Sequence, residues 1–370
     1  MKTVSRGAGV LRLPENTFKR TSEDVFVPFD MVRKYRLSEG ATITGEVETS
    51  ERGRLLKNID SICGMDPEEF SKRPDFRRLT AIDPQERFDF SDSQQQAMRL
   101  LDIVAPIGKG TRGLIVSPPK AGKTTLLKQL ALSIRQAAPE TRIIVLLVDE
   151  RPEEVTDFQR STHAEVLASS SDESVQLHTM LSEMTLAQLR TELECGHDVV
   201  VLVDSLTRMG RAFNLRGSGT GKMLSGGVEA GSLDIPRRFF GSARNIENGG
   251  SITILATALV ETGSRMDELI FEEFKGTGNS ELVLDRELAD SRLFPAIRFN
   301  ASGTRKEENL FPKEQYQAIQ LLRRVLAKQT PAETIKFLLK LTEQFPDNHK
   351  ALAHVSQLAT EQEVSKLLSS

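Results

Sequence analysis

The chain has 370 residues, with 49 Lys and Arg against 52 Asp and Glu, so its formal net charge is −3. This balance excludes a histone-like basic protein, although a local basic patch is enough to bind nucleic acid. Two cysteines, Cys63 and Cys195, provide neither a disulfide framework nor a CxxC metal site and are typical of a reducing compartment. The apolar runs are far shorter than the ~20 residues of a membrane helix. Residues 1–9 carry no apolar signal sequence. We therefore expect a cytoplasmic protein with no membrane partner.

Residues 1–60 hold short segments of alternating apolar residues, at 25–29 and 43–47, separated by a polar turn at 38–40. Short alternating segments broken by such turns predict a small β-barrel or sandwich. Residues 61–93 contain three prolines among dense charges and show little periodicity. We interpret them as a linker with short helical turns.

From residue 94 to residue 370, apolar strands alternate with amphipathic helices, which predicts an α/β domain on a mainly parallel sheet. The near-continuous apolar run at 143–148 suits a strand that helices cover on both faces. The expected buried strands are 113–117, 143–149, 198–204 and 251–258. The tail, roughly 313–368, has the apolar spacing of helices.

The strongest local motif is SPPKAGKT at residues 117–124, which follows the strand at 113–116 and opens an amphipathic helix at 124–135. A P-loop needs this context, because backbone N–H groups at a helix N-terminus bind the phosphates. Lys123 would reach the β- and γ-phosphates, and the Thr124 hydroxyl would face Mg²⁺. Ser117 stands where the general pattern has Gly. The alternative is a chance GKT in a loop, which the strand–loop–helix context disfavours.

Two further predicted strands end in acidic residues. The strand at 199–203 leads to Asp204, and the strand at 143–148 leads to Asp149 and Glu150. In P-loop NTPases, such groups hold the Mg²⁺ shell or orient the attacking water. The alternatives are a helix-capping aspartate at 204 and a solvated charge pair formed by Glu150 and Arg151. Because open α/β sheets bind ligands at the carboxyl ends of their strands, these ends are expected to converge.

The middle of the chain, residues 205–244, is basic and rich in glycine, with seven Lys and Arg against two acidic residues. It includes a glycine-rich loop that ends in Lys222, and a second polar loop at 261–265 carries Arg265. Loops of this kind suit contacts with a nucleic-acid backbone. From composition alone, solvated surface loops are the favoured interpretation.

Several longer motifs identify a family. They are PPKAGKT at 118–124, DERPEEVT at 149–156, DSLTR at 204–208, EEFKGTGN at 272–279 and SGTRKEE at 302–308. Together they resemble the bacterial transcription termination factor Rho family, whose members are RecA-like hexameric RNA-dependent ATPases. The resemblance runs from about residue 9 to the C-terminus. It implies a RecA-like P-loop domain with a helical C-terminal part, preceded by an OB-fold-like RNA-binding domain over residues 1–60.

The resemblance implies ATP and Mg²⁺ as cofactors. It assigns the nucleotide contacts to Pro119, Lys120, Ala121, Gly122, Lys123, Thr124, Thr125, Arg151 and Phe294. Within this set, Phe294 would stack on the adenine and Thr124 would ligate Mg²⁺.

The remaining catalytic roles also come from the resemblance. Glu150 would activate the attacking water, and Asp204 would hold the Mg²⁺ shell through water. Arg305, assisted by Arg292, would be the arginine finger that reaches the γ-phosphate bound by a neighbouring subunit. An arginine supplied in this way can accelerate phosphoryl transfer roughly 10³-fold or more.

The family's RNA contacts fall on two regions. Lys222 would lie in one loop of the central RNA channel, and Thr262 to Arg265 would form another. Arg265 stands where the family usually has Lys, so the charge is kept but the shape is not.

In the N-terminal domain, the family's aromatic-rich segment is reduced. Phe18 and Phe26 remain as stacking platforms, with Arg20 and Asp24 as polar contacts. Because stacking contributes roughly 1–3 kcal/mol per base, we expect a weakened or altered RNA site. The alternative is that Phe18 and Phe26 are core residues of the small barrel.

We therefore expect a ring-forming ATPase that moves 5′→3′ along nascent RNA and terminates transcription. Its partners would be single-stranded RNA, the RNA polymerase elongation complex and five further copies of the chain in a homo-hexamer. One alternative is a Rho-like nucleic-acid-dependent ATPase whose termination role is specialised or lost. A non-enzymatic RNA-binding scaffold and a rotary-ATPase catalytic subunit are further alternatives, disfavoured by the acidic strand ends and by the basic loops, respectively.

Overall fold

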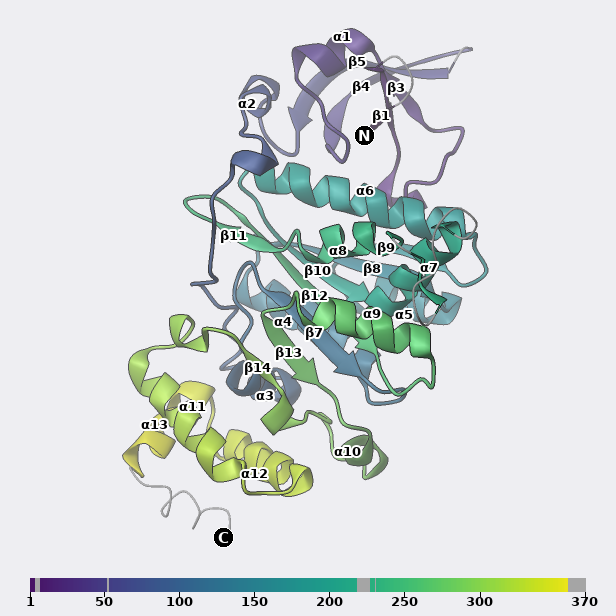
Figure 1. Ribbon diagram of the computed structural model, residues 1–370. Coiled ribbons are helices and arrows are strands. Elements are labelled where there is room, and N and C mark those ends of the chain that lie inside the picture. The colour runs from purple at the N-terminus through teal and green to yellow at the C-terminus, as the bar shows by residue number, and fades with distance from the viewer. Residues whose placement is uncertain (4–6, 52, 218–226, 230, 359–370) are drawn as a thin grey trace.

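The computed structural model describes residues 1–3, 7–51, 53–217, 227–229 and 231–358. A small N-terminal β unit lies against the long helix α6 (Val175–Glu194), which in turn covers one face of a large sheet (Figure 1). The C-terminal helices lie at the far end of the molecule from the N-terminal unit. The predicted order of a small β domain, an α/β domain and a helical tail is confirmed.

The N-terminal unit is built on a five-stranded sheet in the order β1-β2-β3-β5-β4. Its elements are β1 (Lys2–Thr3), β2 (Gly9–Leu11), β3 (Val25–Val27), α1 (Phe29–Lys34), β4 (Ile43–Ser50), β5 (Gly53–Ile62) and α2 (Pro67–Ser71), with a 3-10 turn η2 (Pro14–Asn16). Strands β3 and β5 run parallel, whereas the other neighbours are antiparallel. The expected strand at 25–29 ends at Val27, because Pro28 caps α1 and has no N–H to donate.

The core of this unit extends further along the chain than residue 60. Leu56 and Ile62 on β5 and Phe70 on α2 are buried together. The boundary expected at residue 60 therefore falls inside β5, and α2 belongs to the N-terminal unit by its packing. The segment that follows contains the expected helical turn, η3 (Phe76–Arg78), and also a short strand, β6 (Ala81–Ile82), which pairs with β11 (Arg244–Ile246) of the large sheet. The sequence pattern did not predict that pairing.

The α/β domain is organised around a nine-stranded sheet with the main order β14-β13-β7-β12-β10-β8-β9. Its central strands are β7 (Arg112–Ser117), β8 (Arg142–Glu150), β9 (Glu165–Ser170), β10 (Asp198–Asp204), β12 (Ser251–Leu259) and β13 (Ser280–Val283). These six strands run parallel to one another. β14 (Gly303–Thr304) pairs antiparallel with β13 at one edge, and β11 pairs antiparallel with β12. The four buried strands expected from the sequence are all present, extended by at most one residue at either end.

Helices cover both faces of the sheet. The side chains of β8 alternate, since Ile143 and Val145 join one apolar cluster and Ile144 and Leu146 join the other. The first cluster is covered by α3 (Gln96–Val104), α4 (Lys123–Ala137), α10 (Arg286–Asp290), α11 (Lys313–Leu326), α12 (Pro331–Gln344) and α13 (Asn348–Gln357). The second is covered by α6, α7 (Leu206–Gly217), α8 (Asp234–Phe240) and α9 (Arg265–Lys275). Each large apolar side chain buried in this way stabilises the fold by about 1.5–3 kcal/mol.

The parallel register brings the functional loops together at one edge. Leu259 at the end of β12 pairs with Ser117 at the end of β7, and Val203 on β10 pairs with Ala256 on β12. The loops that follow β7, β8, β10 and β12 therefore share the carboxyl edge of the sheet, where α/β proteins bind ligands. In the part of the chain that the structure describes, no helix has the length and apolarity needed to cross a bilayer.

Candidate functional site

The loop after β7 ends in a helix N-terminus suited to phosphate. Helix α4 begins at Lys123, and Gly122 precedes it with a φ of +92°, a backbone conformation that glycine adopts without strain. The unpaired N–H groups of the first turn form a site for anions. The predicted P-loop is thus present in its expected strand–loop–helix setting, and the Ser117 hydroxyl is turned inward to donate to the Pro118 carbonyl.

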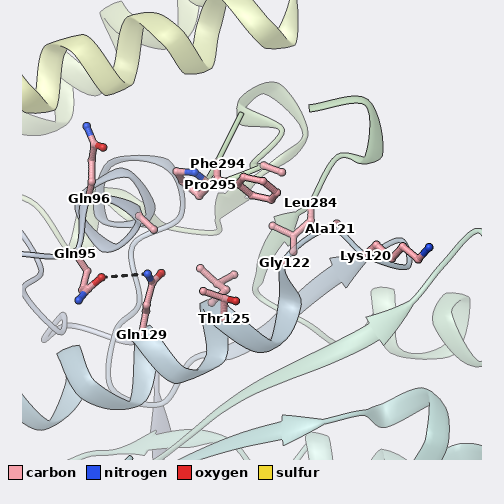
Figure 2. A pocket seen from close by; sticks show the side chains of 13 residues that line it. Gln95, Gln96, Lys120, Ala121, Gly122, Thr125, Gln129, Leu284, Phe294 and Pro295 are labelled. Carbon is pink, nitrogen blue, oxygen red and sulfur yellow. Dashed lines mark hydrogen bonds between the residues drawn. The ribbon is translucent and has the colours of Figure 1, made fainter. Parts of the chain in front are cut away.

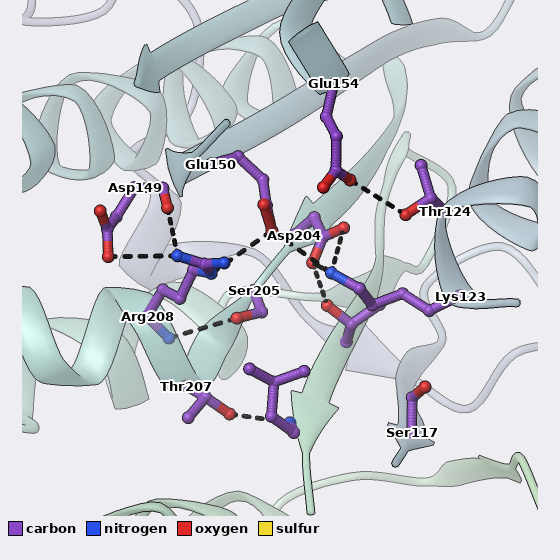
Figure 3. A network of polar contacts seen from close by, with 12 residues as sticks. Ser117, Lys123, Thr124, Asp149, Glu150, Glu154, Asp204, Ser205, Thr207 and Arg208 are labelled. Carbon is purple, nitrogen blue, oxygen red and sulfur yellow. Dashed lines mark hydrogen bonds and ion pairs between the residues drawn. The ribbon is translucent and has the colours of Figure 1, made fainter. Parts of the chain in front are cut away.

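A buried charge cluster lies beside this loop (Figure 3). The Lys123 Nζ lies 2.7 and 2.8 Å from the two carboxylate oxygens of Asp204 and 3.3 Å from Oε1 of Glu150. The Glu150 and Asp204 side chains are at most 1% exposed. Burial acts to lower the pKa of Lys123, but the Asp204 and Glu150 carboxylates outweigh it and raise the pKa. Lys123 is therefore a charged ammonium, as a phosphate-binding lysine must be.

Glu150 combines a raised pKa with a fixed position. Burial raises the pKa of its carboxyl, against the opposing effect of Lys123. Nε of Arg208 lies 3.3 Å from Oε1 of Glu150, and Nη1 of the same arginine donates to the Asp149 carbonyl at 2.5 Å. Within the described residues, Oε2 of Glu150 has no hydrogen-bond partner. A carboxylate that is held in place, has a raised pKa and keeps one open oxygen is suited to accept a proton from water.

The residues around Lys123 also fit a divalent cation. Glu150, Glu154 and Asp204 each offer an oxygen, and these oxygens lie within 4.8 Å of one another. The Thr124 hydroxyl donates to Glu154 at 3.1 Å, and the Thr257 hydroxyl donates to Asp204 at 2.8 Å. Carboxylate and hydroxyl oxygens are the ligands that Mg²⁺ prefers. The donor set therefore fits Mg²⁺ at the place where the phosphates would lie.

A cavity of about 500 Å³ adjoins the P-loop (Figure 2). Thr125 and Gly122 line one side of it, and Phe294 lines another with 46% of its surface exposed. A Cβ on Gly122 would lie 3.6 Å from the Phe294 ring, so the ring lies directly against the loop. The other lining residues include Lys120, Ala121, Gln95, Gln96, Gln129, Leu284, Pro295 and Ala296. The exposed Phe294 ring offers an aromatic face at this cavity beside the start of α4.

The structure separates Arg305 from this cluster. Arg305 follows β14, and its backbone N–H donates to the Asn279 carbonyl at 2.8 Å. Ser280 at the start of β13 pairs with Gly113 near the start of β7. Arg305 is therefore at the amino-terminal end of β7, whereas the P-loop follows the carboxyl end, roughly 17 Å away along the strand. Its side chain is exposed to solvent.

The other two predicted arginines of the nucleotide site lie near the carboxyl edge of the sheet. Arg292 is two residues before Phe294, and its side chain is exposed. Arg151 directly follows Glu150, is exposed and occupies the N-cap position of α5 (Pro152–Ser161). Neither side chain joins the buried cluster around Lys123.

Of the two predicted RNA loops, the one that carries Lys222 lies outside the described residues. The other connects β12 to α9, and Arg265 is its exposed last residue at the start of the helix. The Thr262 hydroxyl donates to Asp267 at 2.6 Å, and Asp267 also accepts two hydrogen bonds from Arg211 at 2.8 and 2.5 Å. Asp267 is buried, so this network fixes the loop to α7.

The structure corrects one prediction in the N-terminal unit. Phe18 is only 7% exposed and belongs to the apolar cluster beneath α6, so the prediction that it is an open stacking platform is wrong. The segment around it is bound to the α/β domain, and Lys19 forms an ion pair with Glu173. Phe26 is 45% exposed, and Leu55 opposes it on β5. The core alternative therefore holds for Phe18, and Phe26 remains a candidate platform.

The two polar RNA contacts predicted for this unit differ in whether their side chains already have partners within the protein or are exposed. Asp24 accepts from the Thr21 N–H at 3.0 Å and pairs with Arg12 at 3.3 Å, so its carboxylate has structural partners. Arg20 is exposed.

Four residues of the site were not assigned roles from the sequence. Glu154 lies in the DERPEEVT motif and Arg208 in DSLTR, one helical turn after Asp204, so both carried a local signal. Thr257 belongs to another segment and contacts Asp204 because the sheet places β12 beside β10. Asp267 lies on α9 and bonds to Arg211 on α7 and to Thr262.

Comparisons with known proteins agree with this geometry. The Rho termination factor RNA-binding domain matches residues 1–68, and the nucleotide-binding domain of the ATP synthase alpha/beta family matches residues 97–304. A type III secretion system ATPase of pathogenic bacteria shares the fold, with a TM-score of 0.63 at 22% identity over 75% of this chain and 87% of that one.

Among sequence relatives, transcription termination factor Rho of Streptomyces lividans is 49% identical over 95% of this chain, which spans 52% of that protein's length. Rho of Karelsulcia muelleri is 48% identical over 89% of both chains, and Rho of Cereibacter sphaeroides is 47% identical over 94% of this chain and 84% of its own. The chain belongs to the transcription termination factor Rho family.

Proposed function

We propose that this protein hydrolyses ATP with Mg²⁺ to move 5′→3′ along single-stranded RNA and that it terminates transcription in the cytoplasm. The observation that carries the proposal is the buried cluster of Lys123, Glu150 and Asp204 at the P-loop, in one chain with an RNA-binding domain of the Rho family. An RNA-binding scaffold would not need these charges, because burying them has a cost that only good pairing offsets.

Each residue of the cluster has a defined task in this proposal. Lys123 binds the β- and γ-phosphates, and Thr124 and Asp204 hold Mg²⁺ and its water ligands. The bound Mg²⁺ neutralises charge that develops on the phosphate oxygens. Glu150 accepts the proton of the attacking water, and Arg208 keeps the carboxylate in position. Phe294 stacks on the adenine, with Pro119, Lys120, Ala121, Gly122, Thr125 and Arg151 around the nucleotide.

The position of Arg305 supports a ring. It lies a strand's length from the phosphate site of its own chain, so its guanidinium cannot reach the γ-phosphate bound there. An exposed arginine in this position is available to the site of an adjacent copy, with Arg292 assisting. We infer a homo-hexamer in which each active site is completed by the neighbouring subunit, as the arginine finger mechanism requires.

RNA is proposed to contact the loops at the carboxyl edge of the sheet. Arg265 offers an exposed cation, and Thr262 is held through Asp267 to Arg211 on α7. Because α7 also carries Arg208, which contacts Glu150, this one helix joins the RNA loop to the catalytic base. Lys222 is assigned to the same channel.

A second function is favoured by one observation. Phe18 is buried, so of the two phenylalanines predicted as stacking platforms only Phe26 is open to a base. A weaker primary RNA site would suit a Rho-family ATPase whose termination role is specialised or lost.

A reconstituted transcription reaction distinguishes the two functions. Purified RNA polymerase would be halted on a template that encodes a pyrimidine-rich transcript. Elongation would then be restarted in the presence of ATP, with or without this protein. The main proposal predicts shortened, released transcripts that depend on ATP hydrolysis and vanish with Glu150→Gln. RNA-stimulated ATP hydrolysis without transcript release would instead support the specialised ATPase.

A further inference from the structure

Arg305 lies in a short segment, residues 302–307, which we call the finger segment. Its backbone is tied to the large sheet, because the Val283 N–H donates to the Ser302 hydroxyl at 2.9 Å in addition to the bond between Arg305 and β13 described above. The Arg305 side chain is exposed and forms no ion pair with any acidic residue that the structure describes. The backbone is therefore fixed, while the guanidinium is available to an incoming group.

One side chain from α11 contacts the finger segment on both sides of Arg305. The Arg323 guanidinium donates to the Ser302 carbonyl at 3.2 Å and pairs with Oε2 of Glu307 at 3.3 Å. Ser302 precedes Arg305 by three residues, and Glu307 follows it by two. The same guanidinium lies over the Phe299 ring, 5.2 Å from its centroid. A single planar group therefore spans the segment that carries Arg305.

Arg323 is itself anchored to the α/β domain. Its Nη2 donates at 2.8 Å to the carbonyl of Val104, the last residue of α3. The Arg323 side chain is 22% exposed and the Glu307 side chain 10%, so solvent screens their pairing less than it screens a surface ion pair. Two elements, α3 and α11, thus fix the guanidinium. An arginine suits this position because its planar fork donates to several acceptors in a fixed geometry.

The pairing of Arg323 also determines what Glu307 can bind. Gln320 on α11 donates to Oε1 of Glu307 at 2.9 Å, and Arg323 occupies Oε2. Arg305, Glu307 and Arg323 line one open cavity of about 330 Å³. Without Arg323, the Glu307 carboxylate would lose its cationic partner and would attract the other cation of this cavity, Arg305. Arg323 therefore both supports the finger segment and keeps Glu307 from drawing Arg305 inward.

We propose that Arg323 is a positioning residue for the arginine finger: it holds the finger segment at Ser302 and Glu307, so that Arg305 extends from its own subunit toward the γ-phosphate bound by a neighbour. The inference rests on the proposed function, in which Arg305 completes the neighbouring site. Arg323 contacts no nucleotide and acts through Arg305. A displacement of about 1 Å can lower turnover roughly 10²-fold, which is less than the roughly 10³-fold contribution of a finger itself.

Steady-state ATP turnover of Arg323→Gln tests the proposal. The kcat should fall roughly 10²-fold. The KM for ATP should stay within about twofold of wild type, because the finger acts in the transition state. Arg323→Lys should recover part of kcat, since an ammonium group still pairs with Glu307 but lacks the planar fork. Lys313→Gln removes an exposed positive charge from the same helix, and this matched control should leave kcat and KM unchanged.

A double-mutant cycle with Arg305→Ala separates positioning from a purely structural role. If Arg323 acts through Arg305, adding Arg323→Gln to Arg305→Ala should lower kcat no further. If Arg323 only stabilises the fold, the double variant should lose more turnover than Arg305→Ala alone.

Co-assembly of two slow variants gives a second readout. In a mixed ring, a Glu150→Gln subunit supplies a correctly held Arg305 to the intact catalytic cluster of an Arg323→Gln neighbour. The mixture should therefore turn over ATP faster than either variant alone, as should a mixture of Arg305→Ala with Glu150→Gln. A general folding defect in Arg323→Gln would not be corrected in this way.

Three results would overturn the inference and leave the finger in place. They are wild-type turnover by Arg323→Gln, a further loss in the double variant, and a mixture of Arg323→Gln with Glu150→Gln that stays slow while the Arg305→Ala mixture recovers. Wild-type turnover by Arg305→Ala would instead refute the finger assigned in the proposed function, and this inference with it. The two failures are therefore distinguishable.

Discussion

Replacement of Glu150 by Gln tests the assigned catalytic base. The substitution keeps the shape of the side chain and removes its charge. Lys123 remains bound to both carboxylate oxygens of Asp204 at 2.7 and 2.8 Å, so this lysine, which we propose binds phosphate, keeps its position. ATP binding should therefore survive, while proton transfer from the attacking water is lost. General bases of this kind contribute about 10²–10⁴-fold to the rate, which is the expected loss in turnover.

The same substitution should lower turnover but raise the stability of the fold. Burial raises the pKa of Glu150 above the 4.5 of an unfolded chain. The folded state therefore keeps the proton longer than the unfolded state, and stability from this group declines as the pH rises through that range. Each unit of such a shift corresponds to about 1.4 kcal/mol. The Glu150→Gln variant has no ionisable group at this position, so its stability does not decline in this way. It should therefore melt at a higher temperature than wild type at pH 7, and the difference should close as the pH falls toward 4.5.

The assay combines steady-state ATP turnover with thermal melts between pH 4.5 and 8. Glu153→Gln, on the exposed side of α5, is the matched control and should leave both quantities unchanged. The reasoning is refuted if Glu150→Gln retains turnover within tenfold of wild type. It is also refuted if the variant melts below wild type at neutral pH.

Five further substitutions test other parts of the structure. Phe294→Ala should raise KM for ATP by roughly 10–100-fold with little change in kcat, because the base loses a stacking partner; an unchanged KM would contradict the base site. Arg305→Ala should lower turnover roughly 10³-fold while nucleotide binding, measured by fluorescence titration, persists. In the wild-type protein, burial raises the pKa of Asp102 to about 6, although the charge of Arg87 acts to lower it. The free energy of unfolding should therefore fall by up to about 3 kcal/mol between pH 4 and 6. Denaturant titrations of Asp102→Asn should show no such dependence on pH. Phe18→Ala should cost about 3–5 kcal/mol of stability, whereas Phe26→Ala should spare stability and weaken pyrimidine-RNA binding roughly tenfold, and equal stability losses would contradict the distinction.

The features predicted well from the sequence are those with local signals. The apolar run at 143–148 predicts β8, and the structure extends it by only a residue or two, to Arg142–Glu150. The P-loop motif and the acidic strand ends are also local signals. As expected, the parallel register places the Lys123 Nζ within 3.3 Å of carboxylate oxygens of both Glu150 and Asp204. To predict that these three residues meet, the sequence pattern needed only one further rule, namely that parallel strands end at the same carboxyl edge of their sheet.

The features that were missed depend on partners distant in the chain. A phenylalanine in a short loop gives no sign of whether it faces RNA or a neighbouring domain, and Phe18 is buried because its loop packs against the α/β domain. Thr257 contacts Asp204 only through the adjacency of β12 and β10.

The most direct test of the account measures ATP hydrolysis by the purified protein under three conditions: no nucleic acid, pyrimidine-rich single-stranded RNA, and duplex DNA. The account predicts a low basal rate that single-stranded RNA alone raises, because the loop at Thr262–Arg265, which we propose contacts RNA, is joined through α7 to Glu150. A rate that is the same in all three conditions would contradict the coupling of hydrolysis to RNA, and with it the translocase function.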